Sequence, residues 1–299
     1  MTFPVRHRRR GVNTLPPMVA AFILVPFLLE ALVVFAPAVQ GVLLSFTEWR
    51  GIGNPQVVGL QNFRELTNDP IFSTGFKNTL RWLVAFGGLS GLLGLSLALL
   101  LRAERRGVAV YRSLIFLPVI FSLVVTALVW RVLYAPEGFF NNALQAVGLG
   151  SWGRIWLAEP HTVLYALVVA SLWRSSGYIM VLYLAGLKSI DPALTEAARV
   201  DGANRWQLLR HITMPQLRGV NSVVVSVIVI EALRSFDIVY ALTKGGPYNS
   251  SQLLSTYMFQ TAFATGRLGY ASAIAMVIFL LAISFIILYL VRALREEAR

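Results

Sequence analysis

Long apolar stretches separated by short polar segments run the length of the chain. Six of them reach the roughly 20 residues that a helix needs to cross the hydrocarbon layer, and they cover residues 18–46, 78–101, 113–134, 162–187, 219–242 and 270–291. The strands of a membrane barrel alternate in polarity, whereas the segment LLGLSLALLL at 92–101 is apolar on every side. The pattern predicts an all-α membrane protein with six transmembrane helices in one domain, residues 18–291.

Composition agrees with a membrane protein and excludes several other classes. Of the 299 residues, 57% are hydrophobic and only 13% are charged, whereas about a quarter of the residues in a soluble protein are charged. The formal net charge is +12, but the basic residues lie at the ends of the apolar stretches, which argues against a nucleic acid partner. The chain has no cysteine and three scattered histidines, so disulfides, thiolate chemistry and a histidine metal site are excluded.

The basic residues also indicate the orientation of the chain. Sixteen Lys and Arg lie in segments 1–17, 102–112, 188–218 and 292–299, and five lie in the loops 47–74, 135–161 and 243–269. Because loops rich in Lys and Arg stay in the cytoplasm, we expect a cytoplasmic N-terminal segment and C-terminal tail. The longest cytoplasmic loop is then 188–218, between spans four and five.

The first apolar stretch has two interpretations. Basic residues before an apolar run, followed by the small residues Ala36-Pro37-Ala38, resemble a cleavable secretory signal. The stretch from Leu15 to Ala38 is longer than the apolar part of such a signal, however, and it contains Pro26 and Glu30. Because five further spans follow, we interpret it as an uncleaved signal anchor.

Motifs for ATP hydrolysis and for membrane hydrolases are absent from the sequence. A phosphate-binding loop ends in Gly-Lys followed by Ser or Thr, and the chain contains no Gly-Lys pair. Neither G-x-S-x-G nor H-E-x-x-H occurs, which leaves little for a hydrolase to use. These absences argue against an ATPase and against an enzyme.

The loop 188–218 is patterned as two short helices joined by a glycine. Asp191 followed by Pro192 is a typical helix start, with a capping carboxylate and a proline suited to the first turn. A helix over 192–201 places three alanines on one face, which permits close packing. Gly202 then occupies a position that favours positive φ, and Asn204 begins a second helix that is expected to end before Pro215.

One interpretation of this loop is an amphipathic hairpin on the membrane surface, with Arg205, Arg210 and Arg218 attracted to anionic lipid. A second interpretation comes from the run Glu196-Ala197-Ala198, Gly202 and Ile212-x-Met214-Pro215. This run resembles the EAA loop of binding-protein-dependent ABC importer permeases. Met214 stands where the family pattern has Leu, and this is a near-isosteric exchange.

Further motifs extend the resemblance over nearly the whole chain. They are VGLQNFREL at 58–66, KNTL at 77–80, LAGLKSI at 184–190, RSFDIVYALTKGGP at 234–247 and GYASA at 269–273. These segments look like the carbohydrate-uptake branch of the family, the maltose, lactose and glycerol-3-phosphate type of permease.

The resemblance implies a mechanism and a set of partners in a bacterial inner membrane. The EAA loop would form a coupling helix that docks on a cytoplasmic ABC ATPase, and the residues assigned to that role are Glu196, Ala197, Ala198, Asp201, Gly202 and Pro215. The implied partners are a second homologous permease, two copies of the ATPase and an extracytoplasmic sugar-binding protein. ATP and Mg would be bound by the ATPase and no cofactor by this chain.

Charged residues within the predicted spans require an explanation, since each costs on the order of 2.5 to 3.5 kcal/mol at a helix centre. They are Glu30, Arg174, Glu231, Arg234 and Asp237. Structural pairing, or contact with the second permease, is the first interpretation for all five, and the i,i+3 spacing favours a pair between Glu231 and Arg234. The alternative is a polar lining for a hydroxyl-rich substrate, with Trp173, Tyr178 and Tyr240 offering faces on which sugar rings stack.

Two other functions compete with an importer subunit. An ion-gradient-driven secondary sugar carrier often shows repeats and helices broken at mid-membrane, and the sequence predicts neither. An intramembrane enzyme acting on lipid-linked sugars would need clustered carboxylates or histidines. The sequence does not identify the sugar.

Overall fold

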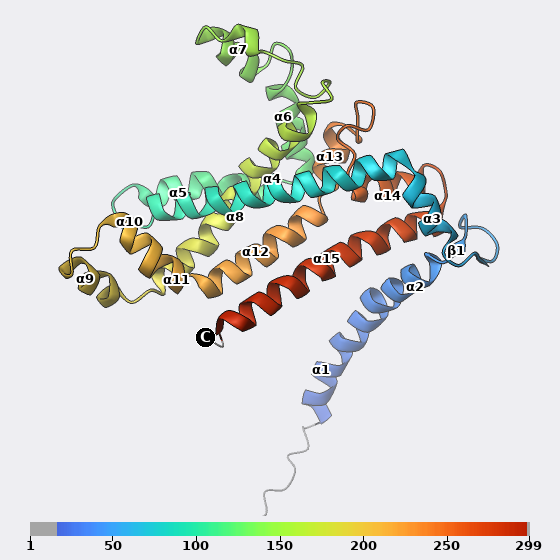
Figure 1. The fold of residues 1–299 in the computed structure, drawn as a ribbon, viewed down its shortest axis with the longest axis horizontal. Helices are drawn as coiled ribbons and strands as arrows, with labels where there is room; N and C mark the ends of the chain where they lie inside the picture. The colour runs from blue at the N-terminus through green and yellow to red at the C-terminus, as the bar shows by residue number, and fades with distance from the viewer. Residues whose placement is uncertain (1–16, 298–299) are drawn as a thin grey trace, which may run out of the picture.

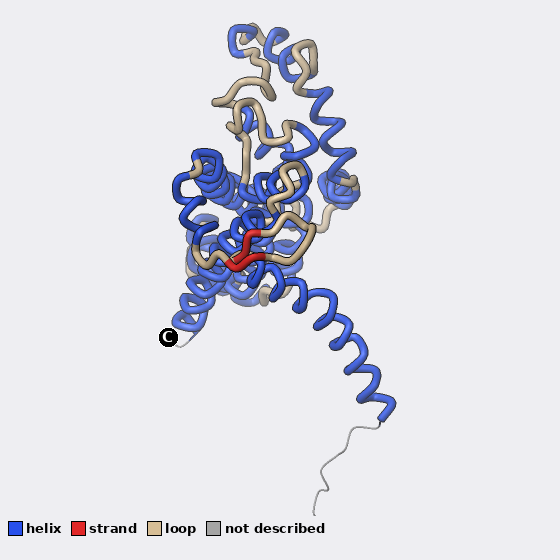
Figure 2. The backbone as a smooth tube through the Cα atoms, turned by 90° about the vertical axis from the view of Figure 1, so that its right-hand side faces the viewer, coloured by secondary structure: helices blue, strands red, loops and turns tan. Residues whose placement is uncertain are grey.

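The computed structural model describes residues 17–297, and these are mainly helical (Figure 1). The longer elements are α1 (Pro17–Glu30), α2 (Ala36–Leu44), α3 (Gln61–Asn68), α4 (Pro70–Leu100), α5 (Val108–Phe116), α6 (Leu123–Leu133), α7 (Phe139–Ala146), α8 (Val163–Lys188), α9 (Pro192–Val200), α12 (Arg218–Leu233), α14 (Leu254–Phe263) and α15 (Leu268–Glu297). The short helices are η1 (Ala31–Phe35), η2 (Leu117–Ile120), η3 (Gly150–Trp152), α10 (Arg205–Leu208), η4 (Leu209–Thr213), α11 (Met214–Gln216) and α13 (Asp237–Leu242). Two strands, β1 (Thr47–Glu48) and β2 (Gln56–Val57), pair antiparallel (Figure 2).

Four helical stretches in the described part of the chain are long and apolar enough to cross a membrane. They are Leu24–Leu44, Pro70–Leu100, Val163–Lys188 and Leu268–Tyr289. Each corresponds to one of the predicted spans, namely the first, second, fourth and sixth. α15 continues to Glu297, past residue 291 where the last span was expected to end, whereas most of the predicted N-terminal segment lies outside the described residues.

The third predicted span, 113–134, is bent and is not one straight helix. The stretch Val108–Ile120 meets Leu123–Leu133 at 104°. Pro118 lies in the 3-10 turn η2, and the side chain of Ser122 accepts a hydrogen bond from the Val125 amide at 3.3 Å, which starts a new helix. If this pair is one span, the described chain has five candidate spans.

The fifth predicted span, 219–242, is interrupted. α12 ends at Leu233 after 16 residues, and α13 begins only at Asp237. The expectation of unbroken helices is therefore wrong at this span as well as at the third. A 16-residue helix is about 24 Å long, which is shorter than the hydrocarbon layer of about 30 Å.

Glycines allow the central helices to cross closely. A Cβ on Gly94 of α4 would lie 2.3 Å from Ile179 Cγ2 of α8, and a Cβ on Gly177 of α8 would lie 2.3 Å from the Ile115 carbonyl of α5. Small residues at helix crossings are the usual means of packing in a bilayer. α8 is consequently the most enclosed of the candidate spans, with 61% of its apolar window buried.

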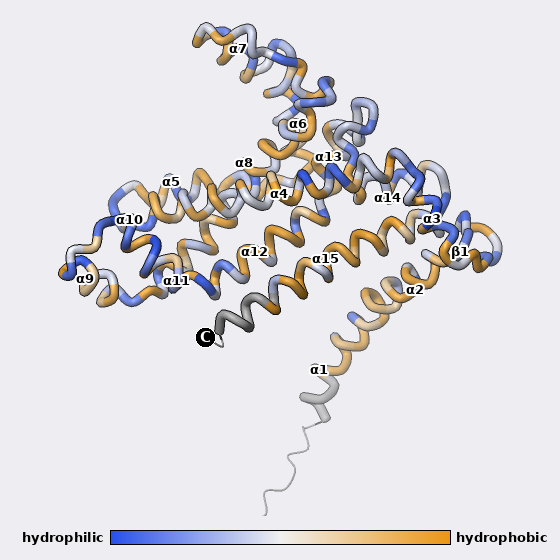
Figure 3. The backbone as a smooth tube through the Cα atoms, in the orientation of Figure 1, coloured by the Kyte–Doolittle hydropathy of each residue, from blue (hydrophilic) through white to orange (hydrophobic). Residues whose placement is uncertain are grey.

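Polar and apolar residues separate along the length of the molecule. Hydrophilic segments gather near α9 to α11 at one end and near α3 and β1 at the other, with apolar helices between them (Figure 3). The α1–α2 arm projects from the other helices in both views (Figures 1 and 2). Glu30 is exposed on this arm, without an ion pair to any side chain that the structure describes.

Candidate functional site

The loop between α8 and α12 forms the predicted helix, glycine elbow and helix. The side chain of Asp191 accepts a hydrogen bond from the Ala193 amide at 2.9 Å and caps α9. Gly202 has φ 83°, the positive value that its position predicts. Asn204 and Gln207 then cap the next helix reciprocally, through hydrogen bonds of 2.7 and 2.9 Å. Because each of these signals is local, the sequence was sufficient to predict the two caps and the elbow.

The second helix of the loop runs further than expected. It continues from α10 through the π-helical turn η4 and α11, past Pro215 to Gln216. In a regular α-helix, the ring of Pro215 would clash with the carbonyl four residues earlier. The wider π turn immediately before α11 relieves that clash, so the predicted end before Pro215 is wrong.

Several apolar residues of this loop are exposed. Leu194 is 42% exposed, Val200 88% and Trp206 65%. Ala197 is also exposed, and Ala198 is half-buried. Exposed large apolar side chains in a polar segment are compatible with a site where another protein binds.

The six residues that the resemblance assigns to ATPase coupling do not all lie together. Ala198, Asp201 and Gly202 line a cavity of about 280 Å³ at the elbow. Glu196 instead lines a separate cavity, between α9 and the ends of the long helices. Pro215 lies in α11, where the loop leads into α12.

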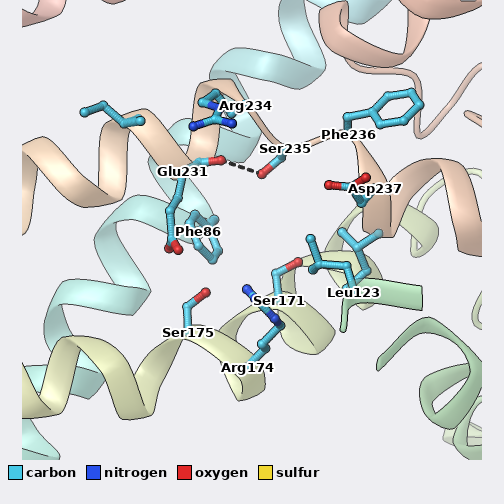
Figure 4. Close-up of a pocket in the computed structure, with 12 residues that line it drawn as sticks. Phe86, Leu123, Ser171, Arg174, Ser175, Glu231, Arg234, Ser235, Phe236 and Asp237 are labelled. Carbon is cyan, nitrogen blue, oxygen red and sulfur yellow. Dashed lines mark hydrogen bonds between the residues drawn. The ribbon is translucent and has the colours of Figure 1, made fainter. Parts of the chain in front are cut away.

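A second candidate site is a polar cavity of about 270 Å³ between α4, α8 and the junction of α12 with α13 (Figure 4). Its predicted lining residues are Arg174, Glu231, Arg234 and Asp237. Tyr178 lines an adjoining cavity of about 330 Å³, which shares Arg174 and Glu231 with the first. Five of the seven residues predicted for a substrate pathway therefore come together.

Glu231 faces Arg174 and not Arg234. Its carboxylate points across the cavity toward Ser175 and Arg174, whereas the Arg234 guanidinium points away (Figure 4). The expected pair between Glu231 and Arg234 is wrong because α12 ends at Leu233, so Arg234 no longer continues the helical face. Glu231 Oε2 and Arg174 Nε are buried, and neither has a hydrogen-bond partner among the described residues. Such atoms usually bind water or a polar ligand.

Trp173 and Tyr240 lie outside both cavities, in aromatic clusters. Trp173 packs against Phe121, with ring centroids 6.4 Å apart. Tyr240 stacks on Phe236 at 5.0 Å and contacts Phe259 edge-on at 5.1 Å. Their aromatic rings serve packing in this structure, and the proposed stacking on a sugar has no support from their positions.

Three serines that the sequence did not single out also line the polar cavity: Ser171, Ser175 and Ser235. The first two lie one turn apart on α8 and flank Arg174. Their spacing places them on the same helical face as Arg174. This spacing was the one feature of the sequence that could have identified them as lining residues. Ser235 belongs to the break after α12 and carried no such signal.

The polar cavity and the loop are connected by two helices. α8 ends at Lys188 and α12 begins at Arg218, so both helices emerge directly from the loop 188–218. Arg174 and Glu231 lie about 20 Å from those ends at 1.5 Å per residue. Continuous helix therefore connects each end of the loop to one wall of the cavity.

Two of the motifs noted in the sequence, KNTL at 77–80 and RSFDIVYALTKGGP at 234–247, lie at the other end of the molecule and hold loops in place. The Asn78 amide donates hydrogen bonds to the carbonyls of Ser250 and Gln252 at 2.8 and 3.2 Å. The Thr79 hydroxyl accepts one from the Leu254 amide at 3.0 Å. A Cβ on Gly245 would lie 1.5 Å from Gln252 Oε1, so this glycine permits the loop to close on itself.

Asp69 joins three helices at the same end. Its carboxylate caps α4 through the Ile71 amide at 2.8 Å and accepts hydrogen bonds from the hydroxyls of Tyr257 and Tyr270. Burial raises the pKa of Asp69, but the hydrogen bonds from the tyrosines and from the Phe72 and Ile71 amides outweigh burial and leave the pKa below 3.8. The carboxylate is therefore held in its charged form.

The sequence and the fold both resemble those of known transporters. The family model described as binding-protein-dependent transport system inner membrane component matches residues 90–299. A probable ABC transporter permease of Pyrococcus horikoshii is 35% identical, over 95% of this chain and 98% of its own. A probable starch degradation products transport system permease of Thermoanaerobacterium thermosulfurigenes is 31% identical, over 89% of this chain and 91% of its own.

Two crystal structures share the fold. One is of a bacterial ABC transporter involved in the import of the acidic polysaccharide alginate; a chain of it superposes with a TM-score of 0.79 at 24% identity, over 93% of this chain and 95% of that one. The other is of a bacterial alginate ABC transporter in complex with an alginate pentasaccharide-bound periplasmic protein. Its TM-score is 0.76 at 25% identity, over 91% of this chain and 92% of that one.

Proposed function

Because the chain belongs to the family of binding-protein-dependent transport system inner membrane components, we propose that it is the permease subunit of an ATP-driven carbohydrate importer. The observation that carries the proposal is the family match over residues 90–299, which contain the exposed loop and every lining residue of the polar cavity except Phe86. Carbohydrate is supported by relatives named for starch degradation products and alginate.

In this proposal the loop 188–218 docks on a separate cytoplasmic ATPase. The contact residues are Glu196, Ala197, Ala198, Asp201 and Gly202, with Pro215 at the base of the loop. The exposure of Leu194 and Val200 supports a protein partner. Because α8 and α12 leave the loop directly, movement of the ATPase rocks both helices as rigid bodies.

The polar cavity forms part of the sugar pathway in this proposal, and a second homologous permease supplies the opposite wall. Arg174 and Glu231 offer charged hydrogen-bonding groups to sugar hydroxyls, and Ser171 and Ser175 add hydroxyls. The buried unpartnered atoms of Arg174 and Glu231 support a polar occupant. Two ATPase copies bind ATP and Mg, an extracytoplasmic binding protein delivers the sugar, and this chain catalyses no reaction.

We further propose six membrane crossings in a bacterial inner membrane, with both termini cytoplasmic. The bent segment α5 to α6 and the interrupted segment α12 to α13 would be the third and fifth crossings. The ion pair between Lys188 and Glu104, at 3.2 Å, supports one shared side for the loops 102–112 and 188–218. The excess of basic residues supports the cytoplasm as that side.

An ion-gradient-driven carrier is the alternative, and the two interrupted spans favour it, since such carriers often contain broken helices. Reconstitution in vesicles separates the two functions. The importer proposal predicts sugar uptake only when the second permease, the ATPase and ATP are present, and no ATP hydrolysis by this chain alone. Uptake by this chain alone, driven by a proton or sodium gradient, would establish the carrier instead.

A further inference from the structure

A cavity of about 390 Å³ lies between α9 and the ends of the long helices. Arg102, from the segment after α4, lines it together with Lys188 of α8 and Arg199 of α9. Leu184, Leu187 and Ile190 provide an apolar lining beside these bases. The cavity therefore combines positive charge with an apolar surface at the end of two candidate membrane spans.

The charges in this cavity are not balanced by carboxylates. Glu196 is the one carboxylate in the lining, and Glu104 binds Lys188 Nζ at 3.2 Å. Arg102 and Arg199 form no ion pair with any side chain described in residues 22–291. Two guanidinium groups thus remain available to an anion.

Hydrogen bonds hold the backbone that carries both arginines. Arg112 donates hydrogen bonds to the carbonyl of Leu101 at 2.6 and 2.9 Å and to that of Ala103 at 3.4 Å, so it holds the residues on either side of Arg102. Arg199 lies on α9, whose first turn is capped by Asp191. Because the backbone is held before binding, only the side chains have to be ordered when a ligand binds.

We propose that this cavity binds the phosphate of an anionic phospholipid headgroup. Guanidinium groups bind phosphate oxygens through paired, charge-assisted hydrogen bonds. The apolar lining comes from the end of α8 and from Ile190 just after it. In the proposed topology this is the level where headgroups meet acyl chains, so the lining suits the start of an acyl chain better than a free phosphate. A lipid in this place joins α9 to α8 and to the segment after α4, and so stiffens the connection between the exposed loop and the spans.

Lipid retention by the full-length chain tests the proposal. The chain is purified in detergent and titrated with phosphatidylglycerol or phosphatidylcholine, and bound lipid is counted by native mass spectrometry. We expect phosphatidylglycerol to be retained in preference. Arg102→Gln with Arg199→Gln lowers its retention by about tenfold or more, since each basic residue near an anionic lipid is worth about 1 kcal/mol.

Matched variants distinguish the effect of basic residues in this cavity on lipid retention from the effect of basic residues elsewhere. Arg205→Gln with Arg210→Gln removes the same amount of charge from the loop 188–218, at positions outside the cavity, and changes retention by less than about twofold. Arg102→Lys with Arg199→Lys restores part of the retention, since it keeps the charge and loses only the fork of donors. An unchanged thermal midpoint in lipid-free detergent verifies that each variant is folded.

The proposal is overturned if the two double Gln variants lose lipid equally, or if glycerol phosphate in solution competes as strongly as the lipid itself. Because no step measures sugar transport, the result stands or falls separately from the proposed importer function.

Discussion

The indole Nε1 of Trp82 donates a hydrogen bond to Ser235 Oγ at 3.0 Å, across 153 positions of sequence. The Ser235 hydroxyl in turn donates to the Glu231 carbonyl at 2.9 Å, and the Ser235 carbonyl accepts a hydrogen bond from Ser255. α4 and α14 therefore hold the backbone at the point where α12 is interrupted. Since Glu231 and Ser235 line the polar cavity, these contacts also fix its shape.

Ser235→Ala is expected to destabilise the protein by about 1 to 3 kcal/mol, because it leaves a fully buried indole N–H without an acceptor. Trp82→Phe removes the same hydrogen bond from the other side. In a double-mutant cycle on thermal stability, the two changes should therefore show a coupling energy of about 0.5 kcal/mol or more. Strictly additive effects would mean that the hydrogen bond between Trp82 and Ser235 does not stabilise the interruption between α12 and α13.

The pairing of Glu231 is testable in the same way. Glu231→Gln should couple to Arg174→Gln, since the two side chains face each other across the cavity, and should not couple to Arg234→Gln (Figure 4). We expect a coupling energy of about 1 kcal/mol for the first pair and near zero for the second. If unfolding measurements give the larger coupling energy for Glu231 with Arg234, they would support the i,i+3 pair that the sequence favours.

The lowered pKa of Asp69 predicts that the folded protein loses stability in acid. Its pKa in the folded protein lies below the ordinary value of 3.8, so its contribution is complete above that value and is lost as the pH falls through the folded-state pKa. Asp69→Asn keeps an oxygen that can cap α4 but removes the titration. The thermal midpoint of the wild type should fall more steeply than that of the variant below about pH 4. Parallel curves would show that Asp69 is not a stabilising carboxylate.

The orientation can be tested by labelling, since the chain has no native cysteine. Asn204→Cys, in the loop 188–218, should react with a membrane-impermeant thiol reagent only after the cells are opened. Tyr248→Cys serves as the matched control at the opposite end, where the side chain is 94% exposed, and it should react from outside. Labelling of Asn204→Cys in intact cells would invert the proposed topology.

Features with a local cause were predictable from the sequence, and those that depend on distant contacts were not. Asp191, Gly202 and Asn204 act within a few residues of their position, so the loop was predicted with its caps and its elbow. The interruption after Leu233 depends on Trp82 and Ser255, which contact it only in the folded protein.

The polar cavity shows the same division. Arg174 and Glu231 were predictable as candidate site residues because a charged side chain in an apolar stretch is energetically unfavourable without a functional or structural reason. Their mutual orientation was missed, since it arises from the packing of α8 beside α12. Helical spacing favoured Arg234 only on the assumption that α12 continues, and it ends one residue earlier.

In the proposed importer the glycine elbow transmits ATPase movement to the spans, and Gly202→Val tests this role. Gly202 has φ 83°, and a Cβ there would meet no atom within 4 Å, so valine adds backbone strain of about 1 to 3 kcal/mol without a clash. Gly202→Asn is the matched control because asparagine tolerates positive φ, and Gly219→Val adds the same side chain where a Cβ also meets open space.

Sugar uptake and ATPase retention are measured for the three variants in the reconstituted transporter. Gly202→Val should assemble in the membrane but lose uptake by about tenfold or more, which corresponds to about 1.4 kcal/mol, and should retain less ATPase. Gly202→Asn and Gly219→Val should stay near the wild type. Full uptake by Gly202→Val with normal ATPase retention would show that the elbow does not transmit ATPase movement.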